Sequence, residues 1–122
     1  MKLEHTLRNG TVAKIRYSKA AIRDLEQIGD YIADELKKTH AALNMVNKIQ
    51  DAIDKLADFP LIGTPLSSKV EIDTDYRFLI CGSYLAFYRL QENDVFVDRI
   101  LYGKRDYIVI LFGDLTQGEP EI

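Results

Sequence analysis

The sequence predicts a single α+β domain in which a helical hairpin packs on one face of an antiparallel sheet, in the order β-α-α-β-β-β. Apolar residues recur every three or four positions over 19–37 and again over 39–59, and these two observations predict the hairpin. A third predicts the sheet, namely three successive β-rich runs, 76–81, 84–90 and 95–102. The chain of 122 residues has room for one domain only.

Each predicted helix has one apolar face and a defined boundary. Ser18 stands where an N-cap hydroxyl accepts a free amide N–H, and the first apolar stripe follows it: Ala21, Leu25, Ile28, Ile32 and Leu36. Pro60 ends the second helix, whose stripe is Ala42, Val46, Ile49, Ile53 and Leu56. Before the helices, the alternating segment VAKIRY at 12–17 predicts a short edge strand. Residues 1–11 show no pattern and are assigned to an N-terminal extension or a further piece of edge strand.

The turns between the β-rich runs decide which side chains share a face of the sheet. Gly82-Ser83 is a two-residue connection with the glycine of a type II′ turn, and 91–94 is read as a four-residue turn. These lengths place Arg77 opposite Tyr88 and Ala86 opposite Arg99. We therefore expect a partly open face that bears Arg77, Tyr84, Tyr88 and Arg99. The opposite face is expected to carry the helices, on Tyr76, Phe78, Ile80, Leu85, Phe87, Phe96 and Ile100.

Composition and charge argue against several classes of function. The net charge of −3 is mild evidence against a nucleic-acid binder, although 77–105 carries five basic and three acidic residues. No apolar run approaches the ~20 residues of a membrane span. The start of the chain also has no signal-peptide core, so we expect a cytoplasmic protein without a membrane partner. Cys81 is the one cysteine and lies far in sequence from His5 and His40, so we expect no metal and no cofactor.

Several short motifs, taken in order, resemble the RelE/ParE toxins of bacterial type II toxin–antitoxin modules. In the first half these are Tyr17-Ser18-Lys19-Ala20-Ala21, Asp30-Tyr31-Ile32-Ala33 and Phe59-Pro60. In the second half they are Gly82-Ser83-Tyr84-Leu85-Ala86-Phe87-Tyr88-Arg89 and Arg99-Ile100-Leu101-Tyr102-Gly103-Lys104-Arg105-Asp106-Tyr107. The resemblance spans residues 12–113 and implies the same compact α+β fold. It also implies an antitoxin whose flexible tail wraps the toxin, with operator DNA contacted only indirectly through that antitoxin.

The RelE-like branch implies catalysis, because its members cut messenger RNA in the ribosomal A site. Such cleavage needs a base for the 2′-hydroxyl, an acid for the leaving oxygen and cations for the charged phosphorane. Arg77 and Arg105 match basic positions of that branch, whereas Leu79 and Leu85 stand where it has basic residues. If the protein is a ribonuclease, its catalytic residues are Arg77, Arg105 and Tyr107, and Tyr107 then needs a different local path.

The ParE-like branch, whose members poison DNA gyrase, matches better, since gyrase poisoning needs a binding surface more than a catalytic set. We interpret the chain as a ParE-like inhibitor of DNA gyrase that a cognate antitoxin neutralises. The alternatives are a RelE-like ribonuclease with a rearranged site and a non-toxic relic that only binds its antitoxin. The apolar run 107–112 is either part of the binding surface or a last strand or helical turn in the core. The expected partner-binding residues are Arg77, Tyr84, Tyr88, Arg99, Lys104, Arg105, Tyr107 and Phe112.

Overall fold

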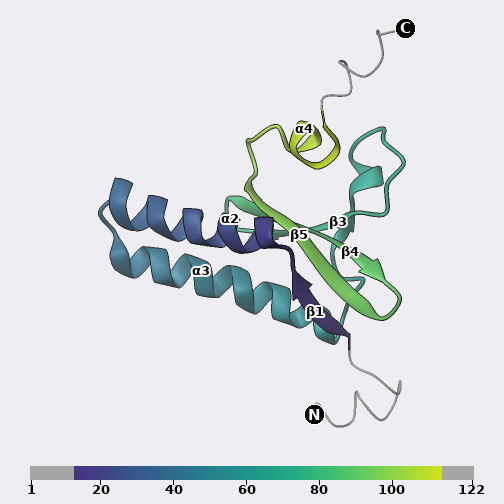
Figure 1. Cartoon of the computed structure of the whole chain (residues 1–122), viewed down its shortest axis with the longest axis horizontal. Helices are drawn as coiled ribbons and strands as arrows, with labels where there is room; N and C mark the ends of the chain where they lie inside the picture. Colours follow the sequence, from purple (N-terminus) through teal and green to yellow (C-terminus); the bar gives the residue numbers. More distant parts are fainter. Residues whose placement is uncertain (1–12, 114–122) are drawn as a thin grey trace, which may run out of the picture.

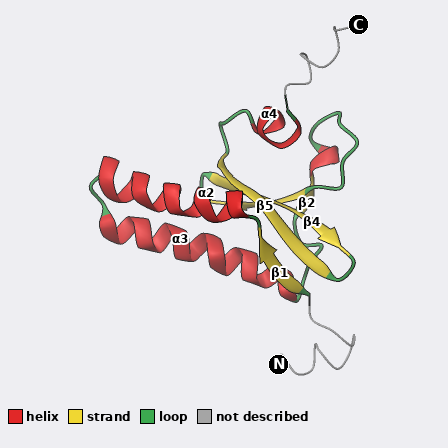
Figure 2. Ribbon diagram, in the orientation of Figure 1, coloured by secondary structure: helices red, strands yellow, loops and turns green. Residues whose placement is uncertain are grey.

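The computed structural model describes residues 13–113, and it confirms the α+β class and the helical hairpin (Figures 1 and 2). The predicted extension at 1–11 lies outside the described residues. The helical elements are α2 (Lys19–Asp30), a π-helical segment (Tyr31–Glu35), α3 (Thr39–Asp54), two 3₁₀ turns (Lys55–Ala57 and Leu66–Ser68) and α4 (Tyr107–Phe112). The strands are β1 (Lys14–Tyr17), β2 (Thr64–Pro65), β3 (Arg77–Cys81), β4 (Tyr84–Gln91) and β5 (Asp94–Tyr102).

The five strands form one sheet in the order β1-β5-β4-β3-β2. The segment VAKIRY supplies the predicted edge strand, but β1 runs parallel to β5, with Ile15 opposite Val95. The sheet is therefore mixed, whereas we had expected it to be wholly antiparallel. Alternation of apolar and polar residues has the same period of two in parallel and antiparallel strands, so it does not indicate direction, and the two-residue β2 gave no sequence signal.

Ser18 begins the hairpin as predicted and also attaches it to the sheet. Its Oγ accepts the Ala21 N–H at 2.9 Å and donates to the Asp98 carbonyl oxygen at 2.7 Å. The helix continues past Asp30 as the π-helical segment, and Lys37, with φ +55°, lies in the connection before α3. The predicted stripes face inward except for Leu36, which is about half exposed, and α2 and α3 lie side by side as an antiparallel pair (Figure 1).

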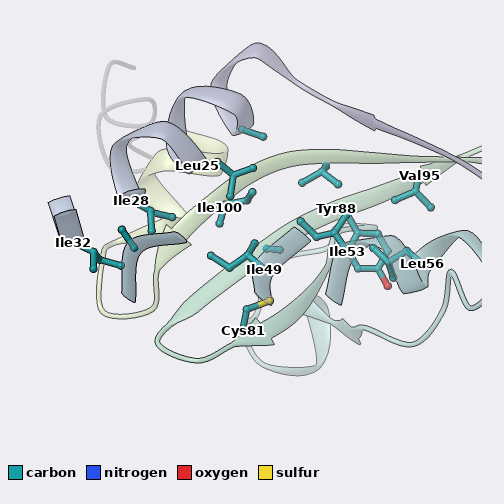
Figure 3. Close-up of a cluster of buried hydrophobic side chains, with 14 residues drawn as sticks. Leu25, Ile28, Ile32, Ile49, Ile53, Leu56, Cys81, Tyr88, Val95 and Ile100 are labelled. Carbon is teal, nitrogen blue, oxygen red and sulfur yellow. The ribbon is translucent and has the colours of Figure 1, made fainter. Parts of the chain in front are cut away.

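The helices cover the face of the sheet that we expected to be open. Tyr88 is fully buried under α3, in a core cluster that also contains Cys81, Ala86, Val95 and Val97 (Figure 3). The helices contribute Ala21, Leu25, Ile28, Ile32, Ala42, Ile49, Ile53 and Leu56 to this cluster. The predicted assignment of faces is therefore wrong. It failed because both faces of the sheet are apolar, so that alternation alone did not separate them.

The second turn is shorter than expected, and a β-bulge accounts for the register error between β4 and β5. Glu92 and Asn93 form a two-residue turn, with Gln91 opposite Asp94, in place of the expected four-residue turn. Tyr88 still lies opposite Val97, but the register then shifts, so that Phe87 faces Arg99 and Asp98 is the extra residue. Ala86 consequently lies opposite Ile100 instead of Arg99.

A second apolar layer covers the other face of the sheet. Leu66, Phe78, Phe87 and Leu101 are buried there. The residues packed against them are Val70, Tyr76, Leu85, Tyr107, Ile110, Leu111 and Phe112. Figure 1 shows α4 and the 66–76 segment on the side of the sheet away from the hairpin. The run 107–112 is thus the packed helical turn of our second alternative, capped by Asp106 Oδ1, which accepts the Val109 N–H.

Candidate functional site

A groove of about 730 Å³ lies between the hairpin and the end of the sheet where β4 begins and β5 ends. We call it the Tyr84 groove. Its walls include the side chains of Tyr31, Leu36, Lys38, Met45, Tyr84, Tyr102 and Arg105. Tyr31, Leu36 and Tyr102 are about half exposed, which is unusual for large apolar side chains brought together in one place. The hairpin and the sheet thus form an apolar recess that no other part of 13–113 fills.

The rim of the Tyr84 groove is cationic. Lys38 and Arg105 line it, and Lys104 is exposed next to Arg105. Among the described residues the arginines that form ion pairs are Arg16, Arg89 and Arg99, so Lys38 and Arg105 keep their charges available. The one carboxylate in the lining, Asp24, is already engaged by Arg99 and by the Ile100 N–H. The groove therefore favours an anionic partner.

Tyr84 sits at the centre of an aromatic group in this groove. Its ring meets Tyr102 edge-on, with 5.9 Å between the ring centroids. Burial raises the pKa of the Tyr84 hydroxyl, and the neighbouring Tyr31 and Tyr102 raise it further, so the phenol stays neutral. Neutral, partly exposed tyrosines present both a flat apolar surface and a hydroxyl, a combination common in protein interfaces.

Arg77 and Tyr88 lie away from this groove and hold the 60–63 loop in place. The Tyr88 hydroxyl accepts the Gly63 N–H at 2.9 Å and donates to the Pro60 carbonyl oxygen at 2.8 Å. Arg77 Nη1 donates to the carbonyl oxygens of Gly63 at 2.8 Å and Leu61 at 3.2 Å. The expectation that Tyr88 is open to a partner is wrong, since none of its side chain is exposed.

Arg99 also performs a structural task. Its Nε and Nη2 each donate to the Asp24 carboxylate at 2.8 Å, in a two-point contact. Asp24 Oδ2 additionally accepts the Ile100 N–H, so the carboxylate caps the part of the β5 edge that β1 does not reach. The contact with Asp24 raises the pKa of Arg99, which keeps the guanidinium charged.

Tyr107 and Phe112 pack against the face of the sheet that α4 covers. Tyr107 contacts the Phe87 ring at a centroid distance of 5.1 Å, and Phe112 meets Tyr76 edge-on at 5.7 Å. Of the eight residues expected to bind a partner, Tyr84 and Arg105 line the Tyr84 groove, and Lys104 is exposed beside Arg105. The remaining five are Arg77, Tyr88, Arg99, Tyr107 and Phe112, which maintain the fold.

Sequence reasoning missed most of the groove. Tyr31, Leu36 and Lys38 come from the end of the hairpin, and Met45 comes from α3. Tyr31 lies off the apolar stripe of α2, and a large aromatic residue on the outer face of an amphipathic helix was a usable signal. Elsewhere, Arg89 pairs with Asp98 at 3.0 Å, and Cys81 is a buried thiol whose pKa is raised by burial.

Within residues 13–113, no cluster of three or more His, Cys, Asp or Glu side chains could hold a metal ion. Over the same range, every helix is too short or too polar to cross a membrane.

The comparison with protein families decides what kind of protein this is. The profile of the ParE toxin of the type II toxin–antitoxin system parDE matches residues 15–107, which is most of the chain. The chain belongs to the ParE toxin family. As a ParE family member it is the toxin component of a type II toxin–antitoxin module, as the sequence motifs indicated.

Two solved structures match this chain. A chain from the chromosomal ParDE toxin–antitoxin system of P. aeruginosa is 22% identical, with a TM-score of 0.63 over 75% of this chain and 96% of that chain. A chain from the RelBE2 toxin–antitoxin complex of Mycobacterium tuberculosis is 19% identical, with a TM-score of 0.49 over 75% and 99%. No curated protein matches the sequence. The ParDE likeness supports the fold.

Proposed function

We propose that this ParE family toxin inhibits DNA gyrase and that a cognate antitoxin neutralises it by seating an acidic, apolar segment in the Tyr84 groove. The observation that supports this proposal is that the arginines differ in whether other residues of the protein already bind them. Arg77 and Arg99 are committed to internal contacts, whereas Arg105 stays available on the rim of an apolar groove. That arrangement favours a protein that acts through binding.

The same geometry weighs against a RelE-like ribonuclease. Arg77 lies opposite Tyr88, whereas Arg105 follows the strand end at which Tyr84 pairs with Tyr102. Tyr84 and Tyr88 are four residues apart on β4, or about 13 Å along the strand. Arg77 and Arg105 therefore stand at opposite ends of the β3–β4 pairing, and the Arg77 guanidinium is held by the carbonyl oxygens of Leu61 and Gly63, which does not favour a shared contact of the two guanidinium groups with one scissile phosphate.

The antitoxin assignment follows from the chemistry of the groove. An antitoxin tail that folds on binding must bury apolar surface to offset its ordering entropy. The exposed Tyr31, Leu36 and Tyr102 side chains supply that surface. Lys38 and Arg105 then select acidic side chains and set the register of the tail.

A gyrase assay tests the proposed target. Purified toxin is added to gyrase and relaxed plasmid, and we expect loss of supercoiling or accumulation of cleaved DNA, reversed by the antitoxin from the adjacent gene. In cells, expression without the antitoxin should arrest growth with filamentation. Codon-specific messenger RNA cleavage with normal supercoiling would instead support the ribonuclease reading. A protein that is well expressed and harmless would support the relic.

A binding assay tests the groove. Tyr84→Ala and Arg105→Ala should each weaken the antitoxin complex by about tenfold, the effect of losing a well-placed aromatic or arginine anchor. Lys69→Ala is the matched control, because Lys69 is an exposed cation beyond the groove lining. Antitoxin affinity that is unchanged in both groove variants would place the antitoxin on another surface.

A further inference from the structure

A second groove, of about 650 Å³, lies on the other side of α2. We call it the Gly29 groove. Its lining includes Ile22, Leu25, Glu26, Gly29, Asp30 and Val46. Successive residues turn by about 100° around a helix axis, so the residues of α2 in this groove face away from those in the Tyr84 groove. The helix separates two binding surfaces, and a partner in one leaves the other open.

The Gly29 groove has an apolar floor. Ile22 is about half exposed at its edge, while Leu25 is buried and Val46 partly buried beneath it. Partly exposed aliphatic side chains in a groove between two helices form a typical seat for an amphipathic helix of a partner.

Gly29 itself indicates that something approaches the helix closely. Glycine is the least favourable residue in a helix interior apart from proline. Packing between α2 and α3 does not require it, since a Cβ at this position would meet only Val46 Cγ2, at an ordinary contact distance of 3.4 Å. Its backbone torsion φ is not positive either. A residue that costs helix stability without an internal reason is best explained by a partner that contacts the bare backbone.

The charge of this groove is opposite to that of the Tyr84 groove. Glu26 and Asp30 stand one turn apart on the same side of α2, where like charges repel. Neither forms an ion pair among the described residues, and Arg23, one turn before, lies outside the lining. The basic Tyr84 groove suits an acidic antitoxin tail, whereas the Gly29 groove suits a cationic partner.

We propose that the Gly29 groove is the surface with which the toxin binds its target, by accepting a basic amphipathic helix of gyrase. This inference rests on the proposed function. Enzymes that act on DNA present lysine and arginine side chains to the phosphates, and a groove rimmed by carboxylates can compete for such a surface. One apolar side chain of that helix packs on Ile22 and Leu25, its backbone crosses Gly29, and its cations face Glu26 and Asp30.

Two sets of variants test the proposal on the purified full-length toxin. In the first, the double variant Glu26→Lys/Asp30→Lys reverses the rim charge. Its matched control is Asp73→Lys/Asp75→Lys, which makes the same change in charge at two exposed residues outside both grooves. We expect the groove variant to need at least about tenfold more protein for half-inhibition of gyrase, with the control unchanged.

The second variant, Gly29→Ala, separates binding from stability. The added methyl removes a helix-breaking residue, so the melting temperature should rise, by about 4 °C if the gain matches the usual glycine-to-alanine difference. Inhibition of gyrase should nevertheless weaken by about tenfold, because the methyl group occupies the place of the partner backbone. A purely structural role for Gly29 cannot give higher stability with lower activity.

Antitoxin affinity, measured by calorimetry, completes the test. Each Gly29 groove variant should bind the antitoxin as tightly as the wild-type toxin does, since the Tyr84 groove is untouched. If the wild-type toxin inhibits gyrase and all the variants inhibit it equally well, this inference is overturned and the proposed function still stands. A wild-type toxin that does not inhibit gyrase would overturn both. If the Gly29 groove variants lose antitoxin binding as well as gyrase inhibition, this inference is also overturned, because the two surfaces would then not be separate.

Discussion

The two ends of the β3–β4 pairing carry the same pair of residue types and use them differently. At one end, Tyr88 and Arg77 make four hydrogen bonds to the 60–63 loop. At the other end, Tyr84 and Arg105 line a groove in which Arg105 has no ion pair among the described residues. A tyrosine–arginine pair therefore does not by itself identify a binding site. What matters is whether nearby backbone groups already satisfy the two side chains.

The largest effect should come from Tyr88→Ala. It deletes a fully buried ring and both hydrogen bonds that hold the loop, so we expect a loss of about 3–5 kcal/mol in the free energy of unfolding. Tyr88→Phe keeps the ring but leaves two backbone groups without their partner, at a cost of about 1–3 kcal/mol. Urea unfolding followed by circular dichroism measures both. Wild-type stability in Tyr88→Ala would contradict the loop-holding role.

Gly63→Ala should have the next largest effect at this end. A Cβ there would lie 2.5 Å from the Tyr88 hydroxyl oxygen and 2.9 Å from the Phe78 carbonyl oxygen, so the loop must move. We expect a loss of about 1–3 kcal/mol, typical of an overpacked interior. The same substitution at Gly29 is the matched comparison, since it should stabilise the protein. Thermal melts of the two variants should shift in opposite directions.

At the Tyr84 end, mutation should change binding without changing stability. The Tyr84→Ala/Arg105→Ala double variant should lose antitoxin affinity by about 10- to 100-fold, as expected for paired anchor residues. Its free energy of unfolding should change much less than that of Tyr88→Ala, because both side chains are partly or fully exposed. Calorimetry and urea unfolding on the same preparations provide the comparison. A large loss of stability would mean that this end also maintains the fold.

The smallest effect should appear at alkaline pH and concerns Tyr76, on the face that α4 covers. Burial first, and then its hydrogen bond to Asp98, together raise its pKa from 10.0 to about 12. A folded-state pKa above the unfolded value gives stability that is complete below pH 10 and is lost as pH rises toward 12. Tyr76→Phe should therefore lose less stability than the wild type over that interval, while Tyr17 titrates in both. Parallel melting curves would contradict this.

The helices were predictable because their signals are local. Apolar spacing located both stripes and Ser18 marked the first cap, whereas α3 ends at Asp54, before the end that Pro60 predicts, and continues as a 3₁₀ turn at Lys55–Ala57. The sheet register was predictable from its turns as far as Tyr88 and Val97. Beyond that point the bulge at Asp98 changes the pairing of β4 with β5, and no residue type in the sequence indicates a bulge at that position.

The site was less predictable than the fold. The sequence analysis named Tyr84 and Arg105, which the structure brings to the Tyr84 groove, but it gave the buried Tyr88 the same rank. The difference lies in the 60–63 loop, which reaches Tyr88 only through a tertiary contact 25 residues away in sequence. The far wall of the Tyr84 groove comes from the end of the hairpin, so no segment of the sequence contains the site as a continuous motif.

The parallel pairing of β1 with β5 has a consequence for the order of events during synthesis. Ile15 pairs with Val95, and the Ser18 N–H donates to the Val97 carbonyl oxygen. The strand that pairs with β1 is therefore synthesised about 80 residues after it. Contacts this distant in sequence form late and slow the folding of small domains. A nascent chain therefore carries its hairpin with no sheet to cover it until β5 has left the ribosome. The Tyr84 groove, whose lining includes Tyr102 and Arg105, is completed only at that stage, so it can receive a partner only when translation is nearly finished.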